Sequence, residues 1–300
     1  GITSGMEIHP VIVIGAGPAG LAAGMQLNRQ GISPLLFERT RIGGLLWNAN
    51  WVENYPGCVD GITGPDLVSL FQDQADRLEV QILREEVLKA SFEDGKFRIA
   101  TKIRDYQSSI LVAASGTVPV AYSLRNLPEN VKEKIHTEIY PLRDVQNKDI
   151  VIIGAGDAAL DYALNLSRHN RVIILNRGSD IKGLKMLWER VQKKSSISYY
   201  DKTKIVGADL DDQGRLVLVT EQGVKKEFIG DYLITAIGRI PEYSFADESI
   251  IKNKQELIND RKLFLIGDLV NGSYRQTAIA VADGIRAAMV IGDLLDKEKE

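Results

Sequence analysis

Apolar residues form two short unbroken runs near the start of the chain, at residues 11–14 and 35–37, and a segment with helical spacing of apolar positions lies between them, at residues 21–30. Unbroken apolar runs of this length are typical of strands that are buried on both faces of a parallel sheet. A glycine-rich stretch at residues 15–20 separates the first run from the helical segment. The pattern predicts a strand, a glycine turn, a helix and a second strand.

The glycine-rich stretch has the spacing of a dinucleotide-binding turn. Gly15 permits the tight turn, Gly17 lets a pyrophosphate approach the backbone, and Gly20 lets the helix pack closely against the strand. The N-terminus of the helix then faces the anion. Glu38 follows the second strand, 18 residues after Gly20, where its carboxylate can accept hydrogen bonds from an adenosine ribose. The sequence therefore predicts a dinucleotide site here.

The same arrangement recurs later in the chain, displaced by 139 positions. The corresponding residues are Gly15 and Gly154, Gly17 and Gly156, Gly20 and Ala159, and Glu38 and Arg177. Two arrangements of this kind indicate two bound dinucleotides. Because an acid at the last position prefers a free ribose hydroxyl whereas a guanidinium can pair with a 2′-phosphate, Glu38 suits FAD and Arg177 suits NADPH. The alternative is that Arg177 is only a solvated charge at a strand end, and NADH is then the other candidate dinucleotide.

Two junction segments divide the chain into domains. Ala114-Ser-Gly116-Thr-Val-Pro119 and Ala236-Ile-Gly238-Arg-Ile-Pro241 each follow an apolar strand and end in a proline, which fixes the direction of the outgoing chain. We predict an α/β fold of two Rossmann-like three-layer (ββα) dinucleotide-binding domains, the second inserted into the first. The FAD-binding domain covers residues 6–117 and 241–300, and the NAD(P)-binding domain covers residues 118–240. Antiparallel layers are expected at residues 92–111 and 216–234.

A final apolar strand completes the first domain. It ends in Gly267-Asp268, where the acid is placed to hold polyol hydroxyls such as those of a ribityl chain. Tyr274-Arg275-Gln276-Thr277 follows and opens an apolar helix that is predicted to run through Ile291. The positive end of this helix would stabilise negative charge at the N1 and O2 edge of a flavin.

Composition and charge exclude several other classes of protein. The 300 residues are 44% hydrophobic and 26% charged, with a formal net charge of −3 and no basic stripe, so nucleic acid is not an expected partner. The longest apolar stretch, residues 11–25, is too short and too broken to span a bilayer, so no membrane association is expected. Residues 1–5 are expected to be a cloning remnant, and nothing at the N-terminus resembles a signal peptide, so a cytoplasmic location is predicted.

The cysteine and histidine content argues against disulfide and metal chemistry. Cys58 is the single cysteine of the chain, so an intramolecular disulfide is excluded. Cys58 is expected to be a small packed thiol. His9, His136 and His169 lie too far apart in the sequence for metal-ligand spacing. No metal site is therefore predicted. No catalytic side chain is predicted either, because a flavin is expected to carry the chemistry.

The motifs together resemble the thioredoxin reductase family of the low-molecular-weight type, over residues 7–295. Gly43-Gly44-Leu45 and Val52-Glu-Asn54-Tyr-Pro-Gly57 are similar to the flavin-embracing segment of that family, and Gly267-Asp268 with Tyr274-Arg275-Gln276 is similar to its C-terminal flavin motif. The resemblance implies that Asn54, Gln276 and Thr277 lie beside the isoalloxazine. It also implies a homodimer built on the flavin domain and a mutual rotation of the domains during turnover.

Three departures from the family pattern bear on function. The redox-active Cys-x-x-Cys that the family places before its second glycine turn would fall between Ile135 and Lys148, and this segment holds no cysteine. The family's paired arginines for the 2′-phosphate are reduced to Asn176-Arg177-Gly178. Leu45 stands where the family usually has a glutamine near the flavin. True thioredoxin reduction is therefore not expected.

The sequence predicts an FAD-dependent NAD(P)H oxidoreductase. Hydride would pass from C4 of the nicotinamide to N5 of FAD, and the electrons would then pass to a non-disulfide acceptor, with a small redox carrier protein as a candidate partner. One alternative is an electron transfer protein like the ferredoxin or flavodoxin:NAD(P) reductases, which resemble this chain in lacking the dithiol. The other is a flavin-bearing regulatory module with a vestigial NAD(P) domain.

The predicted binding residues form two sets, one for each glycine turn. Those expected to bind FAD are Gly15, Gly17, Pro18, Ala19, Gly20, Glu38, Arg39, Gly43, Gly44, Leu45, Asn54, Val87, Ser115, Gly116, Gly267, Asp268, Arg275, Gln276 and Thr277. Those expected to bind NAD(P) are Gly154, Gly156, Asp157, Ala158, Asn176, Arg177, Ile237, Gly238 and Arg239.

Overall fold

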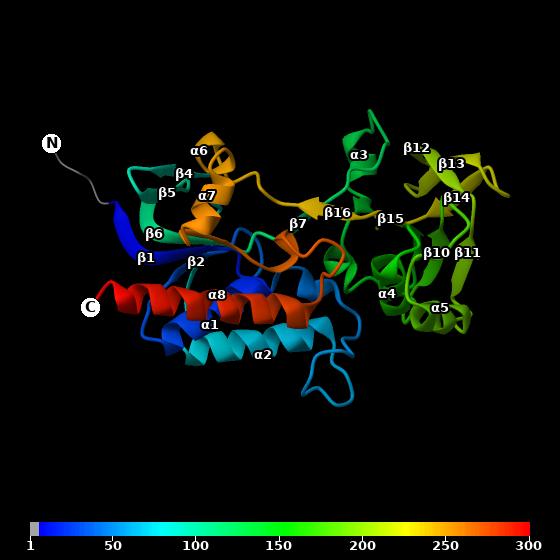
Figure 1. Cartoon of the computed structure of the whole chain (residues 1–300). Helices are drawn as coiled ribbons and strands as arrows, with labels where there is room; N and C mark the ends of the chain where they lie inside the picture. The colour runs from blue at the N-terminus through cyan, green and yellow to red at the C-terminus, as the bar shows by residue number, and fades with distance from the viewer. Residues whose placement is uncertain (1–5) are drawn as a thin grey trace. The chain divides into compact units, whose positions relative to one another are not determined.

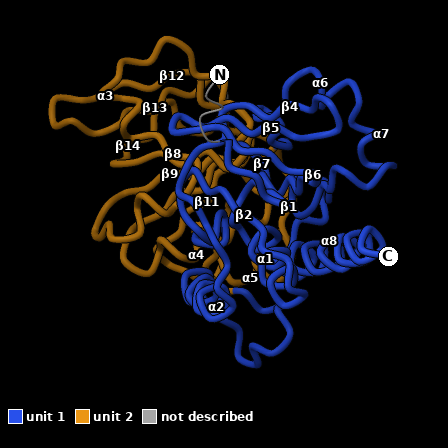
Figure 2. Tube along the Cα trace, turned by 90° about the vertical axis from the view of Figure 1, so that its left-hand side faces the viewer, with its two compact units in different colours: residues 1–47, 52–118, 240–300 blue, residues 48–51, 119–239 orange. Residues whose placement is uncertain are grey.

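The computed structural model describes residues 6–300, with the backbone alone at Gln222, and the expectation for residues 1–5 lies outside the described residues. The chain forms two compact units (Figure 2). Unit 1 contains the chain up to Trp47 together with Val52–Val118 and Ile240–Glu300, and unit 2 contains Asn48–Trp51 and Pro119–Arg239. Both units are therefore assembled from separate stretches of sequence.

One short segment, Asn48–Trp51, groups with unit 2, whereas the predicted domain division placed it in the FAD-binding domain. Hydrogen bonds hold the segment there. Oδ1 of Asn48 accepts from the backbone N–H of Tyr140 at 2.9 Å, and the backbone N–H of Asn50 donates to Oδ2 of Asp161, also at 2.9 Å. Arg168 donates to Oδ1 of Asn50. No hydrophobic periodicity marks these polar contacts, so the sequence pattern did not reveal them.

Unit 1 is built on a seven-stranded sheet in the order β3-β2-β1-β6-β5-β4, with β17 paired to β6 (Figure 1). Its strands are β1 (Glu7–Ile14), β2 (Leu35–Phe37), β3 (Gln81–Leu83), β4 (Lys89–Glu93), β5 (Lys96–Ala100), β6 (Asp105–Ala113) and β17 (Leu263–Leu265). β1 pairs in parallel with β2 and β6, whereas β4, β5 and β6 pair antiparallel. The antiparallel strands expected at residues 92–111 thus extend the main sheet, because β6 pairs with both β1 and β5.

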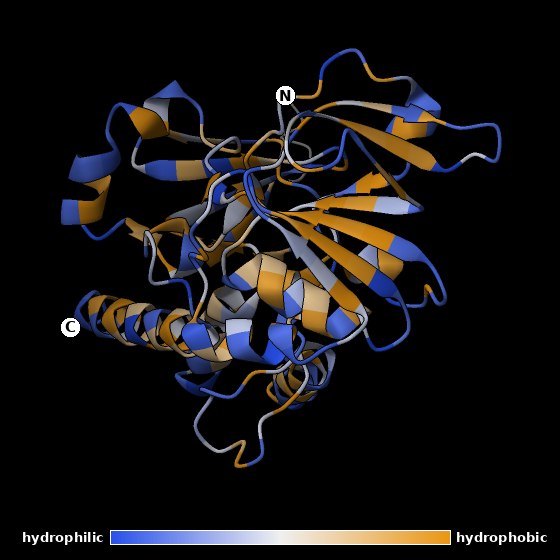
Figure 3. Ribbon diagram, turned by 90° about the vertical axis from the view of Figure 1, so that its right-hand side faces the viewer, coloured by the Kyte–Doolittle hydropathy of each residue, from blue (hydrophilic) through white to orange (hydrophobic). Residues whose placement is uncertain are grey.

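Helices cover the sheet of unit 1. They are α1 (Pro18–Arg29), α2 (Gly64–Arg77), α6 (Glu248–Ile251), α7 (Lys254–Asn259) and α8 (Thr277–Lys297), with 3₁₀ turns at η1 (Gly44–Asn48) and η3 (Gly267–Leu269). α1 and α8 lie side by side, and a Cβ placed on Gly284 of α8 would lie 2.3 Å from the carbonyl oxygen of Ala19. Hydrophobic and hydrophilic residues alternate along α8 (Figure 3), and the helix continues past the predicted end at Ile291.

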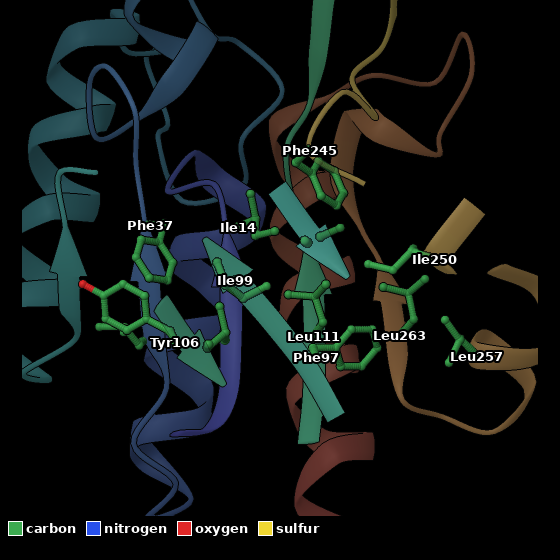
Figure 4. Close-up of a cluster of buried hydrophobic side chains, with 14 of the residues drawn as sticks. Ile14, Phe37, Phe97, Ile99, Tyr106, Leu111, Phe245, Ile250, Leu257 and Leu263 are labelled. Carbon is green, nitrogen blue, oxygen red and sulfur yellow. The ribbon is translucent and has the colours of Figure 1, made fainter. Parts of the chain in front are cut away.

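The core of unit 1 joins residues that are distant in sequence. The cluster in Figure 4 includes Phe37, Tyr106, Leu111 and Leu263, all buried. The ring centroids of Phe37 and Tyr106 lie 4.9 Å apart in an edge-to-face arrangement. Burial of such apolar surface stabilises the sheet, and by this means the core fixes the strand ends from which the site is built.

Unit 2 has a five-stranded parallel sheet in the order β11-β10-β9-β15-β8 and a separate three-stranded antiparallel sheet, β12-β13-β14. The parallel strands are β8 (Ile135–His136), β9 (Asp149–Ile153), β10 (Arg171–Leu175), β11 (Ile197–Tyr200) and β15 (Tyr232–Thr235). The antiparallel strands are β12 (Lys204–Leu210), β13 (Leu216–Gln222) and β14 (Glu227–Gly230). The helices are α3 (Glu129–Lys132), α4 (Asp157–Leu166) and α5 (Lys185–Gln192), with a 3₁₀ turn at η2 (Tyr140–Leu142).

The two faces of β9 show that unit 2 has three layers. Ile150 and Ile152 belong to a buried cluster with residues of α4 and α5. Val151 and Ile153 belong to a different cluster, which contains Leu218 and other residues of the antiparallel sheet. The antiparallel layer begins earlier than predicted, at β12, and the last strand of the predicted stretch, β15, lies in the parallel sheet instead.

The parallel strands have the same spatial order in the two units, although β17 is the last of them along the chain in unit 1 and β8 is the first in unit 2. β1 lies between β2 and β6, as β9 lies between β10 and β15, and β17 adjoins β6 as β8 adjoins β15. Where the chain passes between units, β7 (Thr117–Pro119) pairs with β16 (Arg239–Pro241). In such sheets the crevice beyond the carboxyl end of the central strand is the place where a dinucleotide binds. The fold confirms the predicted α/β class with two Rossmann-like domains.

Candidate dinucleotide sites

The first glycine turn (Gly15–Gly20) leaves β1 and enters α1 at a sharp angle. The N–H of Gly15 donates to the carbonyl oxygen of Phe37 at 2.8 Å, and a Cβ on Gly20 would lie 1.8 Å from the carbonyl oxygen of Gly15. α1 begins with Pro18, and no side-chain hydrogen bond from the described residues caps this end. The N–H groups of its first turn are therefore available to an anion.

The glycine pair of the flavin-embracing segment lies against this turn. The N–H of Gly43 donates to the carbonyl oxygen of Ala16 at 2.8 Å, and a Cβ on Gly44 would lie 3.4 Å from the Cα of Gly17. Gly44 has φ +58° and begins η1, which also contains Leu45. The structure thus brings the backbones of the two glycine motifs into close contact.

Glu38 is oriented toward the glycine turn. Its Oε1 accepts from the N–H of Ala16 at 3.1 Å, and its Oε2 accepts from the N–H of Thr40 at 2.9 Å and from the Thr40 hydroxyl at 3.3 Å. A carboxylate can accept about four hydrogen bonds, so Glu38 retains acceptor capacity for a ribose hydroxyl. The turn and the acid together fit the adenosine and pyrophosphate parts of FAD.

Arg39, Ser115 and Gly116 are brought together by an acid that the sequence did not single out. Glu242 lies 3.6 Å from Nη1 of Arg39, its carbonyl oxygen accepts from the Ser115 hydroxyl at 2.8 Å, and its N–H donates to the carbonyl oxygen of Gly116 at 3.0 Å. Its position directly after the proline of the second junction, Pro241, is the signal that could have identified it.

The C-terminal motif is fixed from α8. Oδ2 of Asp283 accepts from the N–H of Gly267 at 3.0 Å and from the side-chain amide of Asn271 at 2.8 Å. The same amide donates to the carbonyl oxygen of Gly267 at 2.8 Å. Asp268 lies within the 3₁₀ turn η3 that these bonds hold. Asp283 and Asn271 were not predicted, because neither belongs to a recognisable motif.

The remaining predicted FAD residues occupy different surroundings in unit 1. Asn54 and Gln276 are joined by a side-chain hydrogen bond, and Thr277 is the first residue of α8. Nε of Arg275 is buried. Val87 packs against the hydrophobic core of the unit, so its side chain has a structural role.

The second glycine turn (Gly154–Ala159) repeats the first with one addition. The N–H of Gly154 donates to the carbonyl oxygen of Leu175 at 3.0 Å, and a Cβ on Gly156 would meet no described atom within 4 Å. The added feature is a segment that crosses the turn: the N–H groups of Lys182 and Gly183 both donate to the carbonyl oxygen of Ala155 at 3.0 Å. Such an open glycine next to a helix N-terminus fits a pyrophosphate.

The side chains of two predicted NAD(P) residues form hydrogen bonds with other residues of unit 2. Oδ1 of Asp157 accepts from the N–H of Leu184 at 2.7 Å, which fixes the crossing segment to α4. The side-chain amide of Asn176 donates to Tyr199 and to the carbonyl oxygen of Asp180, each at 3.0 Å. Asn176 therefore shapes the loop that carries Arg177.

The other predicted NAD(P) residues lie at the same edge of the parallel sheet. Ala158 is exposed on the first turn of α4, and Ile237 packs against the buried cluster that contains Val151 and Leu218. The carbonyl oxygen of Gly238 accepts from the N–H of Val120 at 2.9 Å. Burial raises the pKa of Tyr162 to about 12, and Arg239 partly opposes this rise.

Among residues 6–300, no group of three or more His, Cys, Asp or Glu residues could hold a metal ion. Within the same part of the chain, no helix has the length and apolar character needed to cross a membrane.

Comparison with known proteins identifies the family. A family model described as pyridine nucleotide-disulphide oxidoreductase matches residues 9–284. The thioredoxin reductase of Mycolicibacterium smegmatis is 28% identical over 96% of this chain and 97% of its own length. Among solved structures, the thioredoxin reductases of Lactococcus lactis and T. acidophilum have the same fold, with TM-scores of 0.83 and 0.81 at 23% identity, and the alignments cover 96% of this chain and 99% and 98% of those chains. The chain therefore belongs to the pyridine nucleotide-disulphide oxidoreductase family, as a thioredoxin reductase-like oxidoreductase that uses FAD and a nicotinamide dinucleotide.

Proposed function

We propose that unit 1 holds FAD, that unit 2 holds NADPH, and that electrons from NADPH reach an acceptor other than a disulfide of this chain. The observation that carries the proposal is the combination of two dinucleotide cradles with a single cysteine, Cys58. An intramolecular disulfide needs two thiols, so the chain cannot form one by itself. The relatives named thioredoxin reductases provide the precedent for two-cofactor electron transfer.

The residues of unit 1 supply binding and orientation. FAD supplies a hydride acceptor that can pass electrons on. The open N-terminus of α1 binds pyrophosphate, and Glu38 binds the adenosine ribose. Asp268, in the turn that Asp283 fixes, binds the polyol chain. The N-terminus of α8 at Thr277 stabilises negative charge at the pyrimidine edge of the flavin.

In unit 2, Arg177 is the residue that selects the dinucleotide. Arg177 lies two residues after the end of β10, where proteins of this fold recognise the 2′-phosphate of NADPH. Its positive charge lowers the pKa of Tyr122, which burial raises, so the two side chains lie near one another. One arginine gives a preference for NADPH over NADH that is smaller than a pair would give.

The acceptor is a small redox carrier protein, and the active species is a homodimer formed by unit 1. α8 exposes Ile279, Ile285 and Met289, with 36%, 38% and 54% of each residue accessible. These apolar side chains on the exposed side of α8 support an interface with a second copy. Size-exclusion chromatography with light scattering would measure twice the mass of the chain, and a monomeric mass would contradict the homodimer.

An anaerobic titration tests the proposed function. NADPH added to the flavin-loaded protein should bleach the flavin absorbance stoichiometrically, with NADH less effective. Bleaching should proceed equally in Cys58→Ser, and thioredoxin should not be reduced by either protein. An unchanged flavin spectrum would favour a regulatory module with a vestigial NAD(P) domain, and thioredoxin reduction that Cys58→Ser abolishes would contradict the non-disulfide acceptor. Reduction of a ferredoxin or flavodoxin at a useful rate would identify the carrier class.

A further inference from the structure

Glu242 is a buried acid that the proposed mechanism does not use. It lies directly after β16, and only 8% of the residue is exposed. Oε1 accepts from the N–H of Ser244 at 2.8 Å. Its backbone is also engaged on both sides, through the Ser115 hydroxyl and the carbonyl oxygen of Gly116. The junction segment at the end of β6 therefore holds the backbone of Glu242, and the N–H of Ser244 holds its side chain.

The carboxylate of Glu242 is kept charged. Burial raises the pKa of this group, but hydrogen bonds from Ser244 and the nearby guanidinium of Arg39 outweigh that effect and hold the pKa below its usual range. Oε2 lies 3.6 Å from Nη1 of Arg39, and the Arg39 side chain is 45% exposed. A fixed, buried anion thus restrains one end of a side chain that otherwise lies at the surface.

Arg39 occupies a defined place in the site. It follows Glu38, whose carboxylate bonds to Ala16 in the first glycine turn. Ser115 and Gly116 follow β6, the strand that pairs with β1 on the side opposite β2. Glu242 therefore contacts the segments after β2 and after β6, which border the crevice on either side of the glycine turn.

We propose that Glu242 is a positioning residue for the adenosine half of FAD: its backbone is anchored to the Ser115-Gly116 turn, and its carboxylate holds Arg39 at the rim of the cradle. This inference rests on the proposed location of FAD in unit 1. Its effect is expected on one half of the cofactor, because its contacts with Arg39, Ser115, Gly116 and Ser244 lie outside the C-terminal flavin motif. Glu242 consequently contributes to the preference of the site for FAD over FMN, which lacks the adenosine.

The test compares ligands that share only part of FAD. The full chain is stripped of flavin, and the Kd values of FAD, FMN and ADP are measured for the parent protein, Glu242→Gln and Arg39→Gln by flavin fluorescence and by competition. Both variants should bind FAD and ADP about fivefold more weakly, the order expected for a partly exposed ion pair, and FMN as the parent does. Glu248→Gln is the matched control, because its carboxylate also lies near a cation, Lys252 Nζ at 3.9 Å, but both side chains are 75% exposed.

A variant that carries both Glu242→Gln and Arg39→Gln distinguishes positioning through Arg39 from a general loss of local stability. If Glu242 acts through Arg39, the double variant should lose little more FAD affinity than Arg39→Gln alone. Equal weakening of FAD and FMN, or unchanged ADP binding, would overturn the inference. If Glu242→Gln does not fold, Arg39→Gln alone provides the test, because Arg39 is largely exposed and its replacement should not prevent folding. An unchanged ratio of FAD to FMN affinity in Arg39→Gln would overturn the proposal. A parent protein that binds no FAD would refute the proposed function instead.

Discussion

The side-chain amide of Asn54 donates a hydrogen bond to Oε1 of Gln276 at 2.8 Å and so joins two residues that are 222 positions apart. Gln276 is the residue immediately before α8, and Asn54 lies in the loop that follows η1. Both side chains were predicted to lie beside the isoalloxazine. Their mutual bond ties the flavin-embracing segment to the N-terminus of α8 and fixes the orientation of both amides.

Replacing Gln276 with alanine removes the acceptor of this bond. We expect the Kd for FAD to rise by between about twofold and tenfold, as for the loss of one neutral hydrogen bond, and the flavin absorbance bands to shift. Titration of the flavin-free protein measures both effects. The matched control is Gln255→Ala on α7, which removes an amide bond to Asn259 of 2.9 Å far from the motif. Equal effects of the two variants would argue against a flavin-side role for Gln276.

The two glycine turns differ at Pro18 against Asp157 and at Gly20 against Ala159, and the second difference predicts unequal tolerance of a methyl group. In Gly20→Ala, the Cβ would meet the carbonyl oxygen of Gly15 at 1.8 Å, so α1 must move away from β1. Overpacking of this kind costs about 1–3 kcal/mol of stability, and the displaced turn should lose FAD. The second turn already contains Ala159. Ala159→Gly should cost about 1 kcal/mol through helix propensity and leave FAD content unchanged.

Flavin absorbance per chain and the midpoint of thermal unfolding distinguish these variants. Full FAD occupancy in Gly20→Ala would show that the first turn can relax without losing its ligand, contrary to the prediction.

Asp283 fixes the C-terminal motif, and its removal should loosen that motif. Asp283→Ala leaves the N–H of buried Gly267 without its carboxylate acceptor, which costs about 1–3 kcal/mol. We expect a lower unfolding midpoint and weaker FAD binding, with a smaller effect in Asp283→Asn, whose amide oxygen can still accept. Asp293→Ala, an exposed position on the same helix, is the control. If FAD affinity is the same in all four proteins, Asp283 does not support the flavin site.

The sequence predicted those features that repeat or that follow a short spacing rule. The glycine turns, the strands that precede them and Glu38 are all local patterns, and the offset of 139 positions made the second unit recognisable from the first. Glu242 and Asp283 could not be found in this way. Each makes a few polar contacts with residues more than ten positions away, and such contacts leave no periodic signal.

The grouping of Asn48–Trp51 with unit 2 has the same explanation. The segment has no apolar periodicity, and its partners Tyr140 and Asp161 are about a hundred positions away in the chain. The segment that crosses the second glycine turn was missed for a related reason, because backbone donors such as the N–H of Gly183 carry no side-chain signature. Motif spacing therefore predicts where a cofactor binds, whereas the residues that support the predicted site are found only where distant segments meet.

Asp161 predicts how the stability of unit 2 depends on pH. Burial raises the pKa of this carboxyl from 3.8 to about 6, against the hydrogen bond from Asn50 and the charge of Arg168, which lower it. Because the folded pKa lies above the unfolded value, the protonated acid favours folding. This contribution is present in full below about pH 4 and is lost as the pH rises through about 6, and it amounts to at most about 3 kcal/mol. Asp161→Asn cannot ionise yet keeps an oxygen for the N–H of Asn50.

The stability of Asp161→Asn relative to the parent protein should therefore increase between pH 4 and pH 7. Chemical unfolding at several pH values measures this difference. Asp161→Ala should remove the same pH dependence but lower stability at every pH, because the N–H of Asn50 then lacks its acceptor. A stability difference between Asp161→Asn and the parent that stays constant from pH 4 to pH 7 would show that Asp161 does not titrate in this range, and that its burial is relieved by water or by movement of Asn48–Trp51.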